Sequence, residues 1–158
     1  MFVGKSWVDD FGNERSARAT ISQVLANMDV MSSSAEAAVK VDAQLAILKA
    51  ATGITDADII PMPFLHEPSF GASLAYQPGT VNLFALDEHT LVVADPHGPV
   101  IGGVDLFKKQ LEEALAPYQV QVKWVDDWNL YHRLAGEVHC GTNALRAVPS
   151  QKWWEVTP

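Results

Sequence analysis

The pattern of apolar and polar residues in the first third of the chain predicts a short strand and two helices. The strand is expected over residues 2–8, and the first helix over residues 16–27. The apolar face of this helix consists of Ile21, Val24 and Leu25. A second helix is expected to begin at a capping box of Ser33 and Glu36 and to end at Gly53. Its apolar face consists of Ala38, Val41, Leu45 and Leu48.

The middle of the chain is rich in residues that interrupt regular structure. A strand is expected over residues 57–64, but Pro61 and Pro63 confine it to a sheet edge or cut it short. Residues 67–79 are rich in Pro, Ser and Gly and are expected to form a loop.

Residues 80–125 predict a strand-strand-helix-strand unit. Two apolar strands, 80–86 and 90–94, are separated by a polar turn, and residues 105–116 carry a helical apolar stripe that stops at Pro117. The final strand is indicated by alternation of apolar Val120, Val122 and Trp124 with polar Gln121 and Lys123. With the two earlier helices, this order places the chain in the mixed α/β class.

Composition narrows the functional classes. The chain has 158 residues, of which 48% are hydrophobic and 19% charged, so it is expected to be globular and of one domain's length. Its formal net charge of −8 argues against nucleic-acid binding, which needs a basic surface. No apolar run is long enough to cross a membrane, and the first residues lack the apolar core of a signal peptide. These features and a lone cysteine lead us to expect a cytoplasmic protein without a membrane partner.

The lone cysteine, Cys140, is the main candidate for chemistry. It lies in the run Gly136-Glu137-Val138-His139-Cys140-Gly141-Thr142-Asn143. A single thiol forms no intramolecular disulfide, so Cys140 is an inert buried residue, a metal ligand or a nucleophile. The flanking glycines and polar neighbours favour the nucleophile, because such a loop can hold a thiol at a surface cleft. A lowered pKa would be needed to make it a thiolate at neutral pH.

The other ionisable residues predict supporting roles. His139 is expected to be buried and structural, because neighbours on an extended segment point to opposite faces. Asp126 and Asp127 are expected to cap the turn that follows the last strand. No histidine pairs with another histidine or cysteine at metal-ligand spacing, so no metal site is predicted. The remaining histidines are His66, His89, His97 and His132.

The cysteine run, with Tyr131-His132 before it and Lys152-Trp153-Trp154 after it, resembles the C-terminal end of the protein-arginine deiminases. Three upstream segments are similar to successive family segments in the same order: residues 56–61, 78–82 and 97–101. The resemblance extends from about Thr20 to Trp154. Residues 1–158 are therefore interpreted as the C-terminal portion of a protein-arginine deiminase catalytic domain.

The resemblance implies both fold and reaction. The family fold is a pseudo-five-fold α/β propeller of strand-strand-helix-strand units, of which this chain would be an incomplete portion. The reaction converts peptidyl-arginine to peptidyl-citrulline and ammonia, with Cys140 as the nucleophile that forms a covalent thiouronium intermediate. Arginine-containing proteins or peptides would be the partners. Calcium is implied as a cofactor, although no ligands for it are identified in this chain.

One departure from the family pattern leaves alternatives open. The family supplies its acid/base histidine and one substrate-binding aspartate from a His-x-Asp motif, and the chain contains no His-x-Asp. We expect the chain to begin after that region and to self-associate or to bind a complementing upstream portion. One alternative is a catalytically inactive fragment that acts as an interaction module. Another is a small-guanidine deiminase of the agmatine type, although the Gly-Glu before His139 and the Trp-Trp after it favour action on proteins.

Overall fold

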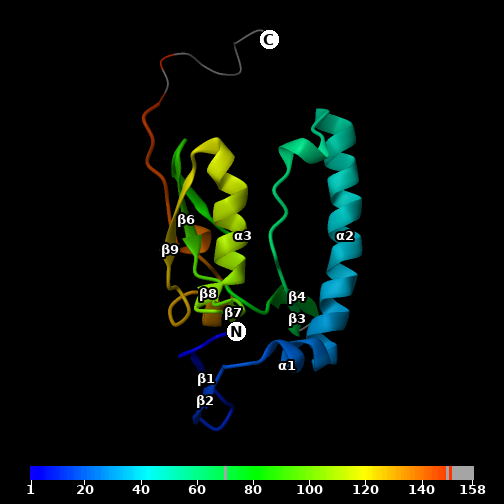
Figure 1. Ribbon diagram of the computed structural model, residues 1–158, viewed down its shortest axis with the longest axis vertical. Helices are drawn as coiled ribbons and strands as arrows, with labels where there is room; N and C mark the ends of the chain where they lie inside the picture. The colour runs from blue at the N-terminus through cyan, green and yellow to red at the C-terminus, as the bar shows by residue number, and fades with distance from the viewer. Residues whose placement is uncertain (70, 149, 151–158) are drawn as a thin grey trace.

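The chain combines helices with several small open sheets, as Figure 1 shows. The computed structural model describes residues 1–69, 71–148 and 150. These residues form three α-helices and nine short strands, and the strands pair into four sheets that do not close on themselves. The predicted mixed α/β class is confirmed. The propeller portion stays a prediction. None of the helices in these ranges is both long and apolar enough to cross a membrane.

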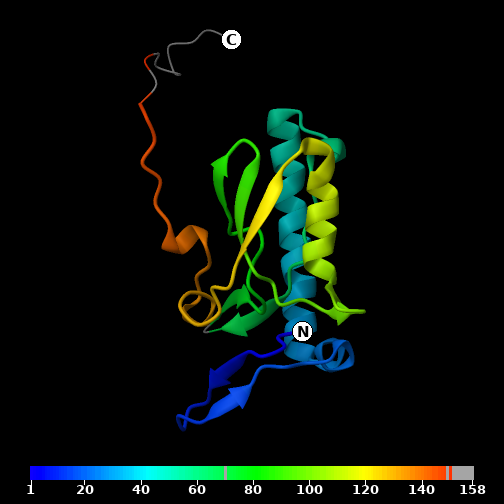
Figure 2. The same ribbon diagram turned by 60° about the vertical axis from the view of Figure 1, so that its left-hand side comes forward.

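The predicted order of strand, strand, helix and strand is confirmed, but the first strand begins at Phe84 rather than at residue 80. Strand β5 (Phe84–Asp87) pairs antiparallel with β6 (Thr90–Ala94), and β6 pairs parallel with β9 (Gln121–Val125). Helix α3 (Leu106–Leu115) makes the crossover between β6 and β9 (Figure 2). A small hairpin of β7 (Val100–Ile101) and β8 (Val104–Asp105) precedes α3.

Helix α3 begins where it does because Asp105 caps it. The Asp105 carboxylate accepts hydrogen bonds from the backbone N–H groups of Phe107 and Lys108, at 2.9 and 3.2 Å. One face of α3 then packs on the sheet and buries a cluster of apolar side chains: Val93, Leu111 and Leu115. This cluster holds β6, α3 and β9 together.

The helical pair at the start of the chain was predicted with the wrong boundary. Helix α1 spans Ile21–Ala26, and the long helix α2 spans Met28–Thr52. Asn27 caps α2 by accepting hydrogen bonds from the N–H groups of Asp29 and Val30. The capping box predicted at Ser33 and Glu36 is therefore wrong, because both residues lie inside a continuous helix. The predicted end at Gly53 is confirmed, with a left-handed φ of 76°.

The predicted buried face of the second helix is also wrong. Val41 and Leu48 are 53% and 48% exposed, and Val30 near the first turn is the buried residue of α2. The reason is visible in Figure 1, where the strands that meet α2, including β3 (His66–Ser69), lie at its lower end. Apolar periodicity reports which face could be buried, whereas burial itself depends on the neighbours.

The segment between α2 and β5 was predicted incorrectly in two places. The strand expected over residues 57–64 is a 3-10 turn (Asp56–Asp58) followed by chain that pairs with no sheet. Pro61 and Pro63 explain this, because each lacks the N–H group that sheet pairing needs. The loop expected over residues 67–79 contains instead a hairpin of β3 and β4 (Ala72–Ala75). Strands of four residues are too short to give a clear alternating signal.

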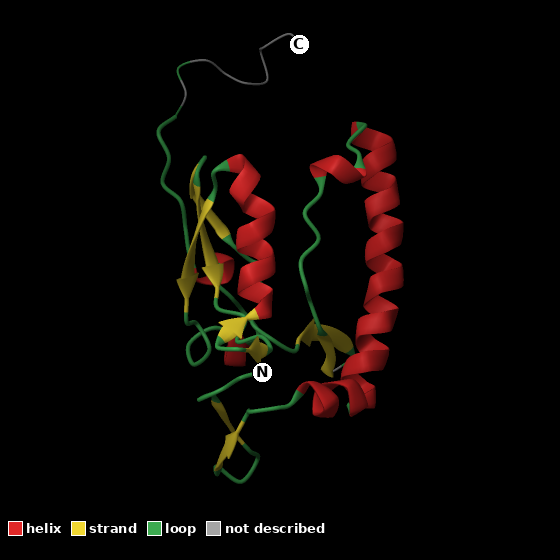
Figure 3. Ribbon diagram, viewed as in Figure 1, coloured by secondary structure: helices red, strands yellow, loops and turns green. Residues whose placement is uncertain are grey.

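A second apolar cluster ties the start of the chain to a segment near its end. After a hairpin of β1 (Ser6–Val8) and β2 (Glu14–Ser16), the chain enters α1 and α2. The predicted strand over residues 2–8 is thus shortened to β1. The cluster consists of Met1, Phe2, Val24, Val30 and Trp128. Beyond residue 141 the chain runs without helix or strand through residue 148, as the loop colour in Figure 3 shows. Lys152-Trp153-Trp154 lies outside the described residues.

Replacing Leu111 with Ala should lower the free energy of unfolding by about 2–4 kcal/mol, because it leaves a cavity in the cluster between α3 and the sheet. Urea unfolding followed by circular dichroism measures this change. Ile47→Ala is the matched control: Ile47 is 71% exposed on α2, and its truncation should change stability by less than about 0.5 kcal/mol. Equal stability of the Leu111→Ala variant and the parent would contradict the position of the core.

The isolated chain should associate with itself as its concentration rises. Helix α2 exposes a set of large apolar side chains whose contact with water is unfavourable: Val39, Val41, Ile47 and Leu48. Sedimentation velocity over a range of concentrations measures the mass. A species that stays at the 17.2 kDa of one chain throughout would contradict this expectation.

Candidate active site

Cys140 lies on a short helical turn at the surface. The 3-10 turn His139–Gly141 is closed by the N–H group of Gly141, which donates to the carbonyl oxygens of Glu137 and Val138, each at 3.2 Å. The thiol is exposed, as predicted for a loop that holds it at the surface. The local backbone is helical rather than extended. The argument that His139 and Cys140 point to opposite faces of an extended segment therefore fails, and His139 is exposed rather than buried.

Gly141 allows a tyrosine ring to cover this turn. A Cβ atom on Gly141 would lie 2.3 Å from Cε1 of Tyr131, so no other residue fits without moving the ring. At the other end of the turn, a Cβ on Gly136 would lie 3.2 Å from the Cβ of Cys140. The two glycines that bracket the run are thus needed for close packing around the thiol.

Asn82 holds the cysteine turn from a distant part of the chain. Its Nδ2 atom donates to Sγ of Cys140 at 3.3 Å, and its Oδ1 atom accepts from the N–H group of His139 at 2.9 Å. The backbone carbonyl of Asn82 also accepts from this N–H group, at 3.2 Å. These contacts orient the side-chain amide with its N–H group toward the sulfur. Asn82 was not predicted as a site residue, although it lies in one of the segments that carry the resemblance.

The hydrogen bonds at the sulfur favour the thiolate. The backbone N–H group of Glu137 and the side-chain amide of Asn82 lower the pKa of Cys140 from its ordinary value. A small loss of hydration and the negative charge of Glu137 act in the opposite direction but are weaker. A lowered pKa increases the thiolate fraction at neutral pH, and the thiolate is the nucleophilic form.

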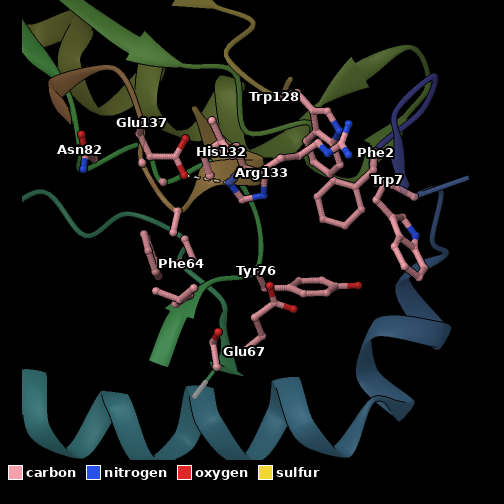
Figure 4. A pocket seen from close by; sticks show the side chains of 18 of the residues that line it. Phe2, Trp7, Phe64, Glu67, Tyr76, Asn82, Trp128, His132, Arg133 and Glu137 are labelled. Carbon is pink, nitrogen blue, oxygen red and sulfur yellow. Dashed lines mark hydrogen bonds and ion pairs between the residues drawn. The ribbon is translucent and has the colours of Figure 1, made fainter. Parts of the chain in front are cut away.

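Behind the turn lies a buried polar cluster of Asp127, His132 and Glu137. His132 Nδ1 lies 2.9 Å from Oε1 of Glu137, so the imidazole N–H group donates to the carboxylate (Figure 4). Asp127 and Glu137 are only 3% and 5% exposed. Burial, together with the facing carboxyl of Glu137, raises the pKa of Asp127 to about 7. Sequence reasoning placed His132 among isolated residues and missed this cluster.

The predicted capping role is correct for Asp126 and wrong for Asp127. The carboxylate of Asp126 accepts a weak hydrogen bond from the N–H group of Trp128 at 3.4 Å and also pairs with Lys5 and His97. The side chain of Asp127 is turned into the protein, and its backbone carbonyl accepts the N–H groups of Tyr131 and His132 instead. Two adjacent aspartates therefore have opposite environments, a difference that the sequence pattern does not contain.

A cleft of about 950 Å³ opens beside this cluster. Its walls carry a group of aromatic side chains: Phe2, Trp7, Phe64, Tyr76 and Trp128. Between them are Glu67 and Arg133, while Asn82 and Glu137 line the end nearest the cysteine turn (Figure 4). Burial raises the pKa of Glu67. Aromatic rings and a carboxylate can hold a flat cation, and Arg133 already places one such group, a guanidinium, in this cleft.

The described ranges contain no group of three or more His, Cys, Asp or Glu side chains placed to hold a metal ion. Neither His66 nor His97 has another histidine as a partner: His66 contacts Ser73, and His97 lies between Asp95 and Asp126. Calcium therefore has no identified ligand set within the described part of the chain.

Comparison with known proteins finds the same family that the residues around Cys140 resemble. The family model described as protein-arginine deiminase matches residues 2–155. The chain belongs to the protein-arginine deiminase family. It is 34% identical over 151 residues to human protein-arginine deiminase type-3, which covers 96% of this chain. It is 32% identical over 148 residues to the human type-4 protein and 31% identical over 147 residues to the mouse type-1 protein, each covering 93% of this chain.

The chain spans 22% of the length of each of these protein-arginine deiminases. The matched region nevertheless contains the cysteine turn, Asn82 and the buried cluster of Asp127, His132 and Glu137. These residues are therefore part of a family domain.

Replacing Asn82 with Ala should raise the pKa of Cys140, because it removes one of the donors that favour the thiolate. At pH 7 we expect alkylation by iodoacetamide to slow by about threefold to tenfold, the factor expected for one hydrogen bond. Mass spectrometry follows the reaction without ambiguity, since the chain has a single thiol. Asn82→Asp should slow it further, because a carboxylate would face the sulfur. A pH–rate midpoint unchanged in both variants would contradict the role of Asn82.

Proposed function

We propose that this chain carries the nucleophile of a protein-arginine deiminase and that Cys140 is this nucleophile. The observation that carries the proposal is an exposed thiol whose pKa is lowered by two hydrogen-bond donors, in a chain of this family. The mature site would act on arginine residues of proteins or peptides. The relatives support this substrate class, because they are named protein-arginine deiminases.

The proposed reaction replaces an imino nitrogen of arginine with oxygen. The Cys140 thiolate donates an electron pair to the guanidinium carbon and forms a C–S bond. A general acid protonates one nitrogen, the C–N bond breaks, and ammonia leaves a thiouronium adduct. Water, deprotonated by the same group, then adds to this carbon, and the C–S bond breaks to regenerate the thiolate. The net change consumes one water and yields citrulline and ammonia.

The chain supports some of these roles better than others. The donors at Sγ of Cys140 would keep the thiolate available, and the cleft with Glu67 and its aromatic walls would bind a cationic peptide. The net charge of −8 would favour the approach of arginine-rich segments. We propose that the acid/base histidine and the carboxylates that grip the guanidinium come from a segment outside these 158 residues. The chain would then be one part of an α/β propeller that binds calcium elsewhere.

One alternative function has an observation in its favour. The sequence has no His-x-Asp, which is consistent with an inactive fragment that acts as an interaction module. This alternative and the proposal give opposite results when the missing portion is supplied.

A haloacetamidine mimic of arginine should label Cys140 when the chain is mixed with the upstream portion of human protein-arginine deiminase type-3 that precedes the matched region. The mixture should also convert a peptidyl arginine to citrulline, because the nucleophile and the acid/base group are then both present. Cys140→Ser should abolish both signals, and Asp42→Asn, at a polar exposed position of α2, should leave them unchanged. Mass spectrometry and a colorimetric citrulline assay are the measurements.

Two outcomes would contradict the proposal. Absence of labelling and of citrulline in a complex shown to form would support the interaction module. Faster turnover of agmatine than of the peptide would support a small-guanidine deiminase.

A further inference from the structure

The buried cluster behind the cysteine turn has a feature that the proposed reaction does not use. We propose that Asp127 and Glu137 share one proton and, with His132, form a positioning cluster that fixes the turn carrying Cys140. The inference depends on the proposed function only for its meaning in catalysis. Its physical content concerns the reactivity of one thiol and can be measured without an arginine substrate.

The carboxyl groups of Asp127 and Glu137 are buried with too few hydrogen-bond partners. Among the described residues, no partner reaches either carboxylate oxygen of Asp127 or Oε2 of Glu137. Each side chain is more than nine-tenths buried, and an ionised carboxylate in such a place is costly without donors. One proton between the two carboxyls changes this, because the protonated oxygen becomes a donor and the facing oxygen its acceptor. The burial and the facing charge that raise the pKa of Asp127 act in the same direction.

Neither a metal ion nor a further side-chain donor neutralises the pair among the described residues. A metal ion would require further ligands, and no group of three or more suitable side chains occurs in the described ranges. His132 offers one donor, which is already directed at Oε1 of Glu137 at 2.9 Å. Its ring also packs on Trp128 with centroids 4.9 Å apart, which fixes its position. A proton is therefore the neutralising species that the geometry favours.

Glu137 connects the carboxyl pair to the sulfur of Cys140. The side chain of Glu137 is anchored in the cluster, while its backbone is the largest cause of the lowered pKa of Cys140 and its carbonyl accepts from the N–H group of Gly141. The next residue, Val138, is buried as well. Holding Glu137 in place thus holds one of the two donors that lower the pKa of Cys140. Loss of the shared proton would place two like charges in contact and weaken this anchor.

Several other charged groups lie near Asp127 and Glu137. From the same segment, Asp126 adds a negative charge that favours the protonated form of Asp127, although Lys5 and His97 pair with it. From the following turn come His132 and Glu137. Glu67 on β3 faces His132 from across the cleft, and Tyr76 faces Glu67. None of these groups provides a cation directly at Asp127.

The raised pKa of Asp127 makes the folded chain less stable as the pH rises. Asp127 holds its proton in the folded chain up to about pH 7, whereas its ordinary value is 3.8. The folded chain thus binds more protons than the unfolded chain between these values. Its contribution to stability is present in full below about pH 4 and is lost as the pH rises through 7. The turn that carries Cys140 should loosen in this same upper range.

The test compares Asp127→Asn with Asp127→Ala in the full 158-residue chain. Asparagine keeps a donor toward Glu137 but has no proton to lose, whereas alanine removes the donor. Alkylation of Cys140 by iodoacetamide should slow by about tenfold in Asp127→Ala at pH 6.5 and stay within about twofold of the parent in Asp127→Asn. Above about pH 8, Asp127→Asn should react faster than the parent relative to its rate at pH 6.5. Asp42→Asn on α2 is the matched control and should follow the parent throughout.

Infrared spectroscopy provides a readout that a merely structural role would not change. The parent should show a protonated-carboxyl band that disappears between about pH 6 and 8 and is absent in Asp127→Asn. This measurement decides the question even if Asp127→Ala fails to fold. Absence of the band in the parent, or equal alkylation rates in the two variants, would overturn the shared proton. A rise in melting temperature on adding calcium that Asp127→Asn abolishes would also overturn it in favour of a cation.

The outcomes separate this inference from the proposed function. If the alkylation and infrared results follow the pattern but no citrulline forms with the upstream portion, only the proposed function fails. If citrulline forms and the band is absent, only the positioning cluster fails.

Discussion

The packing of Trp128 is the contact on which both the fold and the candidate site depend. Its ring lies 5.3 Å from that of Phe2 and 4.9 Å from that of His132, measured between centroids. Its indole N–H group donates to the carbonyl oxygen of Ser6 at 2.7 Å. Each aromatic contact contributes about 0.5–1.5 kcal/mol beyond the burial of apolar area. One side chain thus joins the first residues of the chain to the imidazole that supports Glu137.

The thiol of Cys140 is exposed, whereas the residues that orient its hydrogen-bond donors are held inside the protein or by distant segments. Contact with water alone does not lower the pKa of an exposed thiol. The groups that orient its donors are buried or held by distant segments: Glu137 through the cluster behind it, and Asn82 through the segment that precedes β5. The apolar cluster around Trp128 therefore stabilises a surface feature that makes few apolar contacts of its own.

Local patterns predicted the parts of the molecule that local physics decides. The alternation of Val120, Val122 and Trp124 predicted β9, and the stripe through Leu111 and Leu115 predicted α3, because both elements bury one face on the same cluster. The predicted start of α2 was wrong because Asn27, rather than Ser33, caps the helix. The predicted buried face of α2 was wrong because Val41 and Leu48 on that face are exposed. The β3–β4 hairpin was missed because its strands are too short to carry a period.

The candidate site likewise contains residues that the local sequence predicts and residues that it does not. Cys140 was identified because its neighbours form a local run, and the family comparison agrees with that run. Asn82 was missed because it is 58 residues away, and no periodicity reports a contact at that separation. The environments of Asp126 and Asp127 differ because one side chain meets Lys5 and the other meets Glu137, and both contacts depend on how the turn after β9 folds back.

The groups that favour the thiolate of Cys140 do not include a histidine among the described residues. His139 is adjacent to Cys140 in sequence, but its side chain is exposed, and no hydrogen bond joins its imidazole to Cys140 among the described residues. The thiolate is favoured instead by an amide side chain and a backbone N–H group, neither of which changes charge near neutral pH. Such donors lower the pKa without consuming a base. In the proposed reaction, an acid/base histidine from another segment would then be available for ammonia and water, the two groups whose protons that reaction would move.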